Sequence, residues 1–230
     1  MIPAIVHDSE PVLLVGGGKH RKKAFELAHE YSRKLVAADS GANWLVKHNH
    51  MPDMVIGDFD SISSAVKAKI DPSRTFLVSR QDDTDFEKCL SRISAPLVLG
   101  VGFTGGRIDH QLAAYHGLMR FAAQRCILIG AHDIAFLAPA EARFDLPVGM
   151  RFSLYPLAPL QARSKGLRWP LDGLTLAAGA LIGTSNEVSG PVTLSCDVAA
   201  GLVILPLSAL PAAVAGLRAA GGAWPARQTE

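Results

Sequence analysis

Two acidic segments carry the residue types best suited to chemistry in this chain, and the first is GDFDS at residues 57–61. Residues two apart in an extended chain point to the same side, so Asp58 and Asp60 are predicted to project together while Phe59 faces the core. Two carboxylates on one face repel each other unless a cation neutralises them, and Mg²⁺ prefers oxygen ligands. A polar turn at a strand end, with one aspartate capping a helix near Ser63, explains the same pattern.

The second acidic segment is QDDTDFE at residues 81–87, with three aspartates in four positions. Thr84 and Glu87 have the spacing of a helix capping box, and acidic side chains favour a helix N-terminus. Capping does not require all three aspartates, so at least one is a candidate metal ligand. Asp85 is our choice because it falls on the first helical turn, whereas the other two are explained by the helix start alone.

Glycine-rich segments offer backbone amides to a ligand. Gly16–Gly18 matches neither the P-loop nor the dinucleotide pattern, so it indicates only that backbone comes close to a ligand or turns tightly. The segment GFTGGRIDH at residues 102–110 opens a predicted helix, and its amides together with Arg107 suit polyphosphate oxygens. An ion pair between Arg107 and Asp109, with Asp109 as the N-cap, is the alternative. His110 is interpreted as a structural partner rather than a base.

The elements that must position these segments alternate along the first half of the chain. This alternation of apolar runs and amphipathic stretches predicts βαβ units and a mainly parallel sheet, whose carboxyl ends collect functional groups. The polar segments each follow an apolar run directly. The predicted strands are Val12–Val15, Leu35–Ala38, Met54–Ile56, Thr75–Val78, Leu97–Val101 and Cys126–Ile129, and the predicted helices are Lys22–Arg33, Ala65–Ile70, Asp85–Ile93 and His110–Ala123.

After about Ala138 long helical patterns vanish, and prolines and glycines separate short apolar runs. This pattern of short apolar runs predicts a small antiparallel sandwich or barrel. We place the boundary in a loop at 139–147, which gives domains 1–140 and 145–230. The predicted strands of the second domain are Arg151–Tyr155, Leu174–Leu176, Val192–Ser195 and Leu202–Leu205.

Composition narrows the class of protein further. Of 230 residues, 49% are hydrophobic, which excludes a disordered chain, and 23 Lys and Arg nearly balance 21 Asp and Glu, which argues against a duplex-DNA binder. Three widely spaced cysteines indicate reduced thiols and a cytoplasmic protein. The first residues do not have the pattern of a signal peptide. The uncharged run Val198–Leu217 contains two prolines, so we expect a strand and an Ala-rich tail there, and no membrane span.

Clustered carboxylates, glycine turns and one arginine suit Mg²⁺-dependent chemistry on a nucleotide polyphosphate. In this order, the segments resemble the thiamine pyrophosphokinase (thiamine diphosphokinase) family. Two departures are Gln81, where many bacterial members have lysine, and Ala114, where asparagine is common. The matching segments are DSGAN at 39–43, PDMVIGDFDS at 52–61, QDDTDFEKCL at 81–90, GGRIDH at 105–110, GLRWPL at 166–171 and GTSNE at 183–187.

The resemblance implies a mainly parallel α/β nucleotide-binding domain followed by an antiparallel β-sandwich that binds thiamine. The implied reaction moves the pyrophosphoryl group of ATP to the hydroxyl of thiamine, giving thiamine diphosphate and AMP. Mg²⁺ would be held by Asp58, Asp60 and Asp85, which with Arg107 and Asp109 form the expected catalytic set. The expected ATP contacts are Gly17, Asp39, Asn43, Gly105, Arg107, Asp109 and His110. Asp39 can also be explained as a helix N-cap.

The resemblance also implies a homodimer with thiamine near the subunit interface, and no nucleic-acid or membrane partner. An indole face can hold the cationic thiazolium or stack on the pyrimidine, so Trp169 is a candidate, with Ser185, Asn186 and Gln81 as hydrogen-bonding partners. Trp169 as a core anchor and Asn186 as a turn residue are the alternatives. The rival functions are a pterin pyrophosphokinase, a non-catalytic thiamine sensor and, with a broken glycine pattern, a nicotinamide dehydrogenase.

Overall fold

The computed structural model describes residues 3–79, 82–222 and 224–225. The chain divides into two compact units, one made of residues 1–117 and 128–131 and the other of residues 118–127 and 132–230. Both helices and a large set of strands are present, so the fold is mixed α/β. Each unit is described by itself below.

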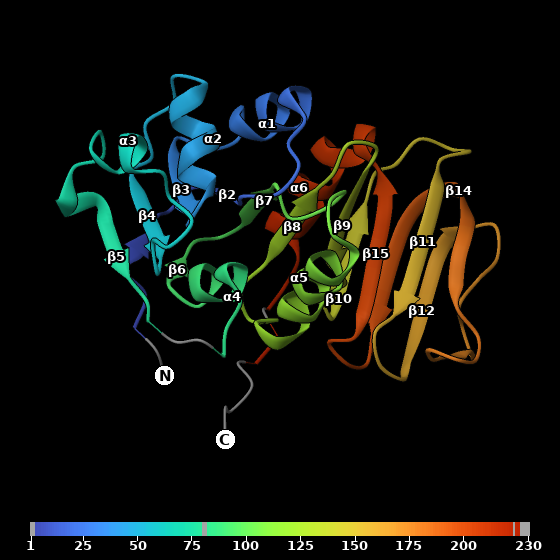
Figure 1. The fold of residues 1–230 in the computed structure, drawn as a ribbon. Helices are drawn as coiled ribbons and strands as arrows, with labels where there is room; N and C mark the ends of the chain where they lie inside the picture. The colour runs from blue at the N-terminus through green and yellow to red at the C-terminus, as the bar shows by residue number, and fades with distance from the viewer. Residues whose placement is uncertain (1–2, 80–81, 223, 226–230) are drawn as a thin grey trace. The chain divides into compact units, whose positions relative to one another are not determined.

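A parallel sheet forms the centre of the first unit (Figure 1). All neighbouring strands in it run parallel, and Leu14 lies opposite both Val36 and Gly100. Its central strands are buried at every residue, as expected for a parallel sheet covered on both faces. The strand order is β7 (Val98–Val101), β2 (Val12–Val15), β3 (Lys34–Ala38), β4 (Met54–Gly57) and β5 (Thr75–Leu77).

Helices follow most strands of this unit, as in βαβ units. In α4, Thr84 and Glu87 form the predicted capping box, with each side chain bonded to the other residue's backbone N–H. The helices are α1 (Lys22–His29), α2 (Gly41–Lys47), α3 (Ser64–Lys67), α4 (Asp85–Leu90) and α5 (Ile108–Arg120), with a short 3₁₀ turn η1 at Pro72–Arg74. A separate parallel pair joins β1 (Val6–His7) to β6 (Ile93–Ser94).

The turns that follow β2, β3, β4 and β7 meet at the carboxyl edge of the sheet. The Gly16 and Gly18 amides donate to the carbonyls of Val101 (2.8 Å) and Gly102 (3.0 Å). A Cβ atom at Gly18 would lie 2.5 Å from the backbone carbonyl oxygen of Gly102, so only glycine allows this approach. The sequence therefore packs two glycine turns against each other at the edge where the polar segments were predicted.

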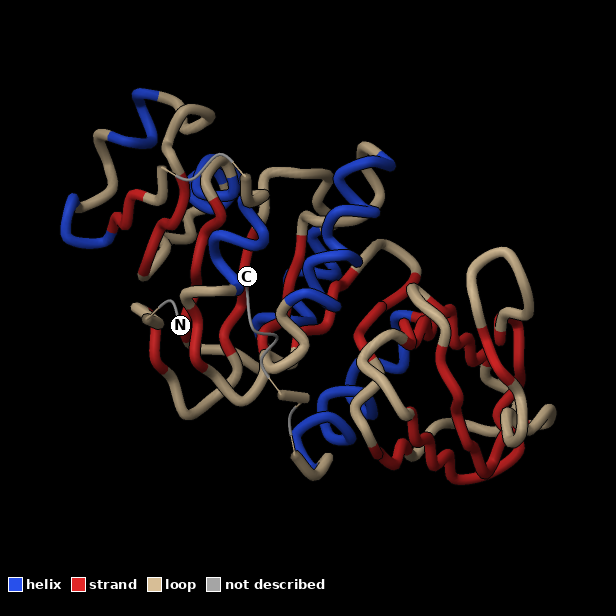
Figure 2. Tube along the Cα trace, turned by 90° about the horizontal axis from the view of Figure 1, so that it is seen from below, coloured by secondary structure: helices blue, strands red, loops and turns tan. Residues whose placement is uncertain are grey.

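The second unit is built from antiparallel strands (Figure 2). The longest, β14 (Gly183–Cys196), pairs with β11 along its first half and with β10 and β12 along its second half. The other strands are β9 (Asp133–Leu137), β10 (Glu141–Phe144), β11 (Arg151–Pro156), β12 (Leu160–Leu167), β13 (Thr175–Leu176) and β15 (Gly201–Pro206).

Several local expectations are wrong. Helix α2 was not predicted, because its first residues form the DSGAN segment that suggested a ligand contact. Strand β10 occupies part of the segment 139–147, where a loop was expected. The Ala-rich tail is the helix α6 (Leu210–Ala219), preceded by a 3₁₀ turn η2 at Leu207–Ala209, and it packs on β10 through Gly216 and Phe144. Within the described residues, no helix is long and apolar enough to cross a membrane.

Candidate active site

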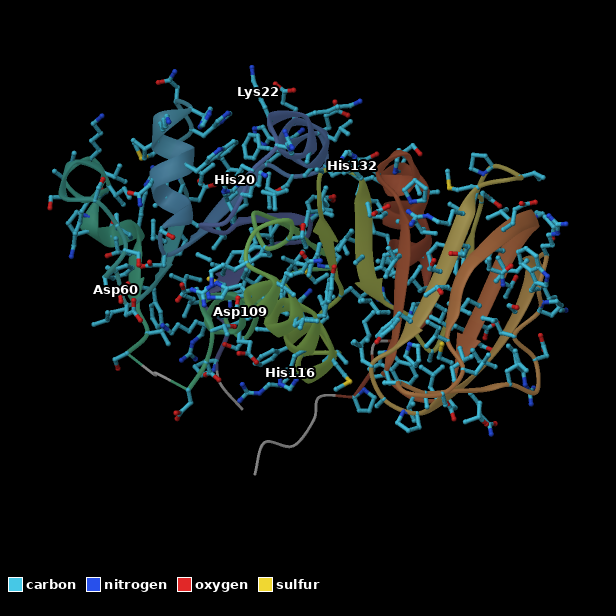
Figure 3. The ribbon with its side chains drawn as sticks, turned by 45° about the vertical axis from the view of Figure 1, so that its right-hand side comes forward. His20, Lys22, Asp60, Asp109, His116 and His132 are labelled. Carbon is cyan, nitrogen blue, oxygen red and sulfur yellow. The ribbon has the colours of Figure 1, made fainter. Side chains whose placement is uncertain are left out.

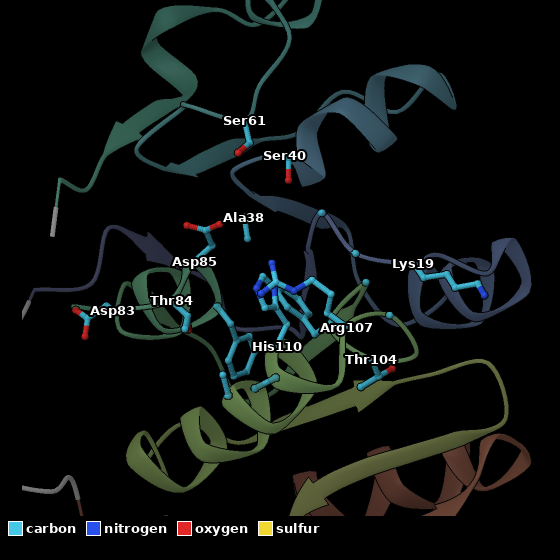
Figure 4. A pocket seen from close by; sticks show the side chains of 18 residues that line it. Lys19, Ala38, Ser40, Ser61, Asp83, Thr84, Asp85, Thr104, Arg107 and His110 are labelled. Carbon is cyan, nitrogen blue, oxygen red and sulfur yellow. The ribbon is translucent and has the colours of Figure 1, made fainter. Parts of the chain in front are cut away.

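A pocket of about 490 Å³ opens at the carboxyl edge of the parallel sheet in the first unit. It is lined by the turns after β2, β3 and β7 and by the first residues of α4 and α5. Figure 4 shows Arg107 and His110 in the middle of the pocket, Asp85 and Thr84 to one side and Lys19 at the other. The polar liners, besides the glycine backbone, are Lys19, Ser40, Ser61, Asp83, Thr84, Asp85, Thr104, Arg107 and His110.

Three aspartates, Asp39, Asp58 and Asp60, converge beside this pocket. One carboxylate oxygen from each lies within 4.8 Å of the others. Asp39 is fully buried; its Oδ1 accepts the Phe59 N–H at 2.9 Å, whereas its Oδ2 has no hydrogen-bond partner among the residues that the structure describes. A buried, unpaired carboxylate oxygen is unfavourable unless a ligand completes it. Residues that line the pocket flank the cluster in the chain, namely Ala38, Ser40 and Ser61.

The backbone that brings these carboxylates together is not the predicted extended strand. Phe59 has a φ of 64° and Asp39 a φ of 43°, both in the left-handed region that non-glycine residues rarely adopt. Phe59 is half-buried, with the Lys67 ammonium 5.8 Å from its ring centre, so the expectation that it faces the core is wrong. Asp58 and Asp60 do share a side, but a sharp turn places them there.

A buried lysine balances part of this negative charge. Lys88, whose side chain is 4% exposed, donates to Asp58 at 2.6 Å and to Asp85 at 3.2 Å. The ion pair with Asp58 lowers the pKa of that carboxyl. Burial, followed by the charges of Asp85 and Asp58, raises the pKa of Asp39. The negative charge of Asp58 is therefore stabilised by its surroundings, whereas the negative charge of Asp39 is unfavourable.

The donor set fits a divalent cation. Asp39, Asp58 and Asp60 offer only oxygen atoms, and the Oδ2 atom of Asp39 is buried without a hydrogen-bond partner in the described part of the chain. Oxygen ligands of this type suit Mg²⁺ better than zinc or copper. Asp60 also accepts a hydrogen bond from the Ser61 hydroxyl at 2.7 Å, which fixes its carboxylate. This cluster of three aspartates could hold a metal ion.

Arg107, directly before α5, supplies a guanidinium to the pocket. Arg107 lines it and makes two hydrogen bonds to Asp109, at 3.1 Å from Nε and 2.5 Å from the terminal nitrogen. This pairing lowers the pKa of Asp109 to about 2. The Gly105 amide donates to the Gln111 side chain at 2.9 Å, and α5 begins at Ile108, so Asp109 lies in its first turn instead of at the N-cap.

Of the predicted nucleotide contacts, Gly17, Arg107 and His110 line the pocket, and Asp39 lies in the adjacent cluster. Gly105 and Asp109 do not line it, and neither does Asn43. Its amide nitrogen donates to the Ser61 carbonyl at 2.9 Å, and its oxygen accepts the Ser63 N–H at 3.0 Å. Asn43 thus fixes the loop that carries Asp60.

A second, smaller cavity of about 200 Å³ lies in the second unit. Its lining combines Trp169, the first residues of β14 including Asn186, and apolar side chains, namely Pro170, Leu171, Leu174, Leu176, Leu181 and Ile182. Trp169 is 53% exposed, so the alternative that it anchors the core is wrong. Asn186 is buried in β14, which also excludes the turn alternative; its side chain accepts the Trp169 N–H at 3.1 Å and donates to the Trp169 carbonyl at 2.6 Å.

Ser185 and Gln81 are the other two predicted thiamine contacts. Ser185, with a φ of 60°, donates its N–H to Ser153, and it does not line this cavity. Gln81 lies outside the described residues.

The sequence analysis missed Lys19 and Lys88. Lys88 stands three residues after Asp85 on a predicted helix, and this spacing places both side chains on one face. The pairing of Lys88 with Asp85 could therefore have been predicted from the sequence. The pairing of Lys88 with Asp58, thirty residues away, was not visible before the fold was known.

Glycine turns, a guanidinium and a cluster of aspartates at the carboxyl edge of a parallel sheet define a class of nucleotide-handling α/β enzymes. Two family descriptions match this chain: "Thiamin pyrophosphokinase, catalytic domain" at residues 25–129 and "Thiamin pyrophosphokinase, vitamin B1 binding domain" at residues 143–200. The chain belongs to the thiamine pyrophosphokinase family.

Individual relatives agree with this assignment. The chain is 31% identical over 196 residues to a protein named thiamine pyrophosphokinase 1 from Oryza sativa subsp. japonica, covering 70% of this chain and 74% of the relative. The fold is similar to that of thiamin pyrophosphokinase from Candida albicans, with a TM-score of 0.72, 18% identity and coverage of 87% and 92% of the two chains. The Bacillus subtilis enzyme structure gives a TM-score of 0.70 at 21% identity, covering 86% and 98%.

Proposed function

We propose that this chain transfers the pyrophosphoryl group of ATP to the hydroxyl oxygen of thiamine, producing thiamine diphosphate and AMP. In this reaction the alcohol oxygen bonds to the β-phosphorus, and AMP leaves with the oxygen that bridged the α- and β-phosphorus atoms. The observation that carries the proposal is the placement of Arg107, the glycine turns and the Asp39–Asp58–Asp60 cluster at one sheet edge. The names of the relatives support the choice of thiamine as the acceptor.

The residues in and beside the pocket have different roles in the proposed reaction. The turns at Gly17 and Gly106 offer backbone to the triphosphate, and Arg107 adds a guanidinium suited to two phosphate oxygens. Asp39, Asp58 and Asp60 would hold Mg²⁺, which when bound neutralises charge on the phosphates. Asp85 lines the pocket and remains a proposed ligand, although in the structure it bonds Lys88.

For thiamine we propose the exposed indole of Trp169, with Ser185, Asn186 and Gln81 as polar contacts. The flat indole is accessible, and the guanidinium of Arg168 lies 4.9 Å from its ring centre, a cation–π contact of the kind proposed for the thiazolium. We propose a homodimer in which thiamine binds near the subunit interface. Exposed Leu181 and Ile182 on the same cavity are consistent with a surface that a partner covers.

The proposed arrangement is a parallel α/β nucleotide-binding domain at 1–140 and a β-sandwich thiamine-binding domain at 145–230. It is supported by the parallel pairing of β7, β2, β3, β4 and β5, the antiparallel pairing beyond residue 132, and the two family matches. We also propose a cytoplasmic location, which is consistent with three free, buried cysteines.

The test is a coupled assay of AMP release from ATP. We expect release to require both thiamine and Mg²⁺, and to be lost in Asp60→Asn. Asp71→Asn, which changes an exposed aspartate outside the cluster, is the matched control and should retain activity. AMP release that is independent of thiamine, or that requires a pterin alcohol instead, would overturn the proposed acceptor. Light scattering at micromolar concentration tests the dimer, and a particle of monomer mass would contradict it.

A further inference from the structure

His20 lies just outside the pocket, in the segment between β2 and α1, and it contacts both glycine turns. Its Nε2 is 2.7 Å from the Gly16 carbonyl oxygen. Because a carbonyl only accepts, Nε2 must carry the hydrogen and donate it. The ring also stacks on Trp44 of α2, with centres 4.4 Å apart and planes 21° apart.

The same ring lies against the turn that follows β7. A Cβ atom at Gly102 would be 2.4 Å from the ring carbon Cε1 of His20 and 2.8 Å from the Gly16 carbonyl oxygen. Gly102 has a φ of 80°, so glycine is required there both for its backbone conformation and for this contact. His20 therefore holds two turns together at a point where neither has a side chain of its own.

Both turns line the pocket, whereas His20 does not. Gly17, Gly18 and Lys19 come from one turn, and Gly102, Phe103 and Thr104 come from the other. Figure 3 shows His20 well apart from Asp60 of the carboxylate cluster. Burial lowers the pKa of His20, the bond to Gly16 raises it in part, and nearby His48 lowers it, so the ring is a neutral single donor near pH 7.

We propose that His20 is a positioning residue for the nucleotide: its hydrogen bond to Gly16 fixes the Gly16–Gly18 turn against the Gly102–Gly106 turn in the shape that receives the triphosphate. The inference rests on the proposed function, because it assumes that ATP occupies this pocket. Loss of one hydrogen bond that orders a binding loop is expected to weaken nucleotide affinity about tenfold.

The test compares His20→Gln with His20→Met. The two side chains have similar length, but only glutamine can donate to the Gly16 carbonyl. Affinity is measured by calorimetry with α,β-methylene ATP, which cannot undergo the transfer, in the presence of Mg²⁺. We expect His20→Met to bind about tenfold more weakly and His20→Gln to stay within about threefold of the wild type. His48→Ala removes the other imidazole stacked on Trp44, at 4.2 Å, and should bind normally.

Kinetics supply a second measurement. In His20→Met the KM for ATP should rise while the KM for thiamine and the kcat at saturating ATP stay unchanged. Equal affinities in the Gln and Met variants, or an equal loss in His48→Ala, would overturn the role of His20 while leaving the proposed function intact. Failure of the wild type to bind α,β-methylene ATP would overturn both.

Discussion

Replacing Asp39 with asparagine should stabilise the metal-free protein and remove its stabilisation by Mg²⁺. Asparagine keeps an Oδ1 that can accept the Phe59 N–H, which Asp39 now accepts at 2.9 Å. The substitution removes the buried negative charge and puts an NH₂ group in place of the second oxygen, which has no partner in the described part of the chain. Its effect on stability therefore reports the electrostatic strain at the cluster.

The magnitude follows from the spacing of the carboxylates. Two unit charges at the 4.8 Å limit of the cluster repel by about 1 kcal/mol in water-like surroundings and by about 3.5 kcal/mol at an effective dielectric constant of 20. The ammonium of Lys88, bound to Asp58, offsets part of this repulsion. We expect a net gain of roughly 1–2 kcal/mol in the free energy of unfolding, which corresponds to roughly 2–8 °C in melting temperature.

The assay is thermal unfolding at pH 7, in EDTA and in MgCl₂. Asp39→Asn should melt above the wild type in EDTA and should shift less on addition of Mg²⁺. The matched control is Asp71→Asn, because Asp71 is exposed and also accepts a backbone N–H, from Ser73 at 2.9 Å. It should show no gain. A lower melting temperature for Asp39→Asn in EDTA, together with an undiminished Mg²⁺ shift, would refute the reasoning.

Three further outcomes are expected. Lys88→Met should lower the melting temperature in EDTA by several degrees, because breaking a buried pair leaves a carboxylate without its counter-charge, whereas the exposed Lys69→Met should not. Arg107→Gln should return the pKa of Asp109 from about 2 toward its ordinary 3.8, as measured by a carbon-13 titration. Because folding lowers this pKa, the ion pair stabilises the folded protein above pH 3.8. That stabilisation is lost as the pH falls through about 2. Trp169→Ala should raise the KM for thiamine strongly with little change in the KM for ATP or in melting temperature, because the indole is exposed; a large fall in melting temperature with an unchanged KM would contradict its role as a contact.

The strands of the parallel sheet could be predicted because each is a short apolar run, whereas the short pair β1 and β6 was not, and the helix predicted to reach Ile93 ends at Leu90. Val12–Val15 and Cys126–Ile129 coincide with the observed strands β2 and β8. The start of α4 was also predictable, since a capping box depends only on residues three apart. These patterns involve residues close together in the chain, so they predict the local structure correctly where no long-range contact favours another conformation.

What could not be predicted depends on contacts between distant residues. The convergence of Asp39 with Asp58 and Asp60 requires the register of β3 against β4, and the turn at Phe59 requires a backbone conformation that its sequence does not favour. Strand β14 was predicted only in its last residues, and its two halves pair with different strands, which a local pattern does not reveal. Strand β12 alternates buried and exposed residues, and this pattern was overlooked among its basic side chains.

The amide of Asn186 has a consequence for recognition at Trp169. By accepting the N–H and donating to the carbonyl of the same residue, it imitates the pair of hydrogen bonds that a neighbouring strand would supply. The backbone at Trp169 is therefore ordered before any ligand arrives, although the indole itself is in solvent. A flat ligand that stacks on this ring loses little conformational entropy of the protein, so more of the contact energy remains as affinity.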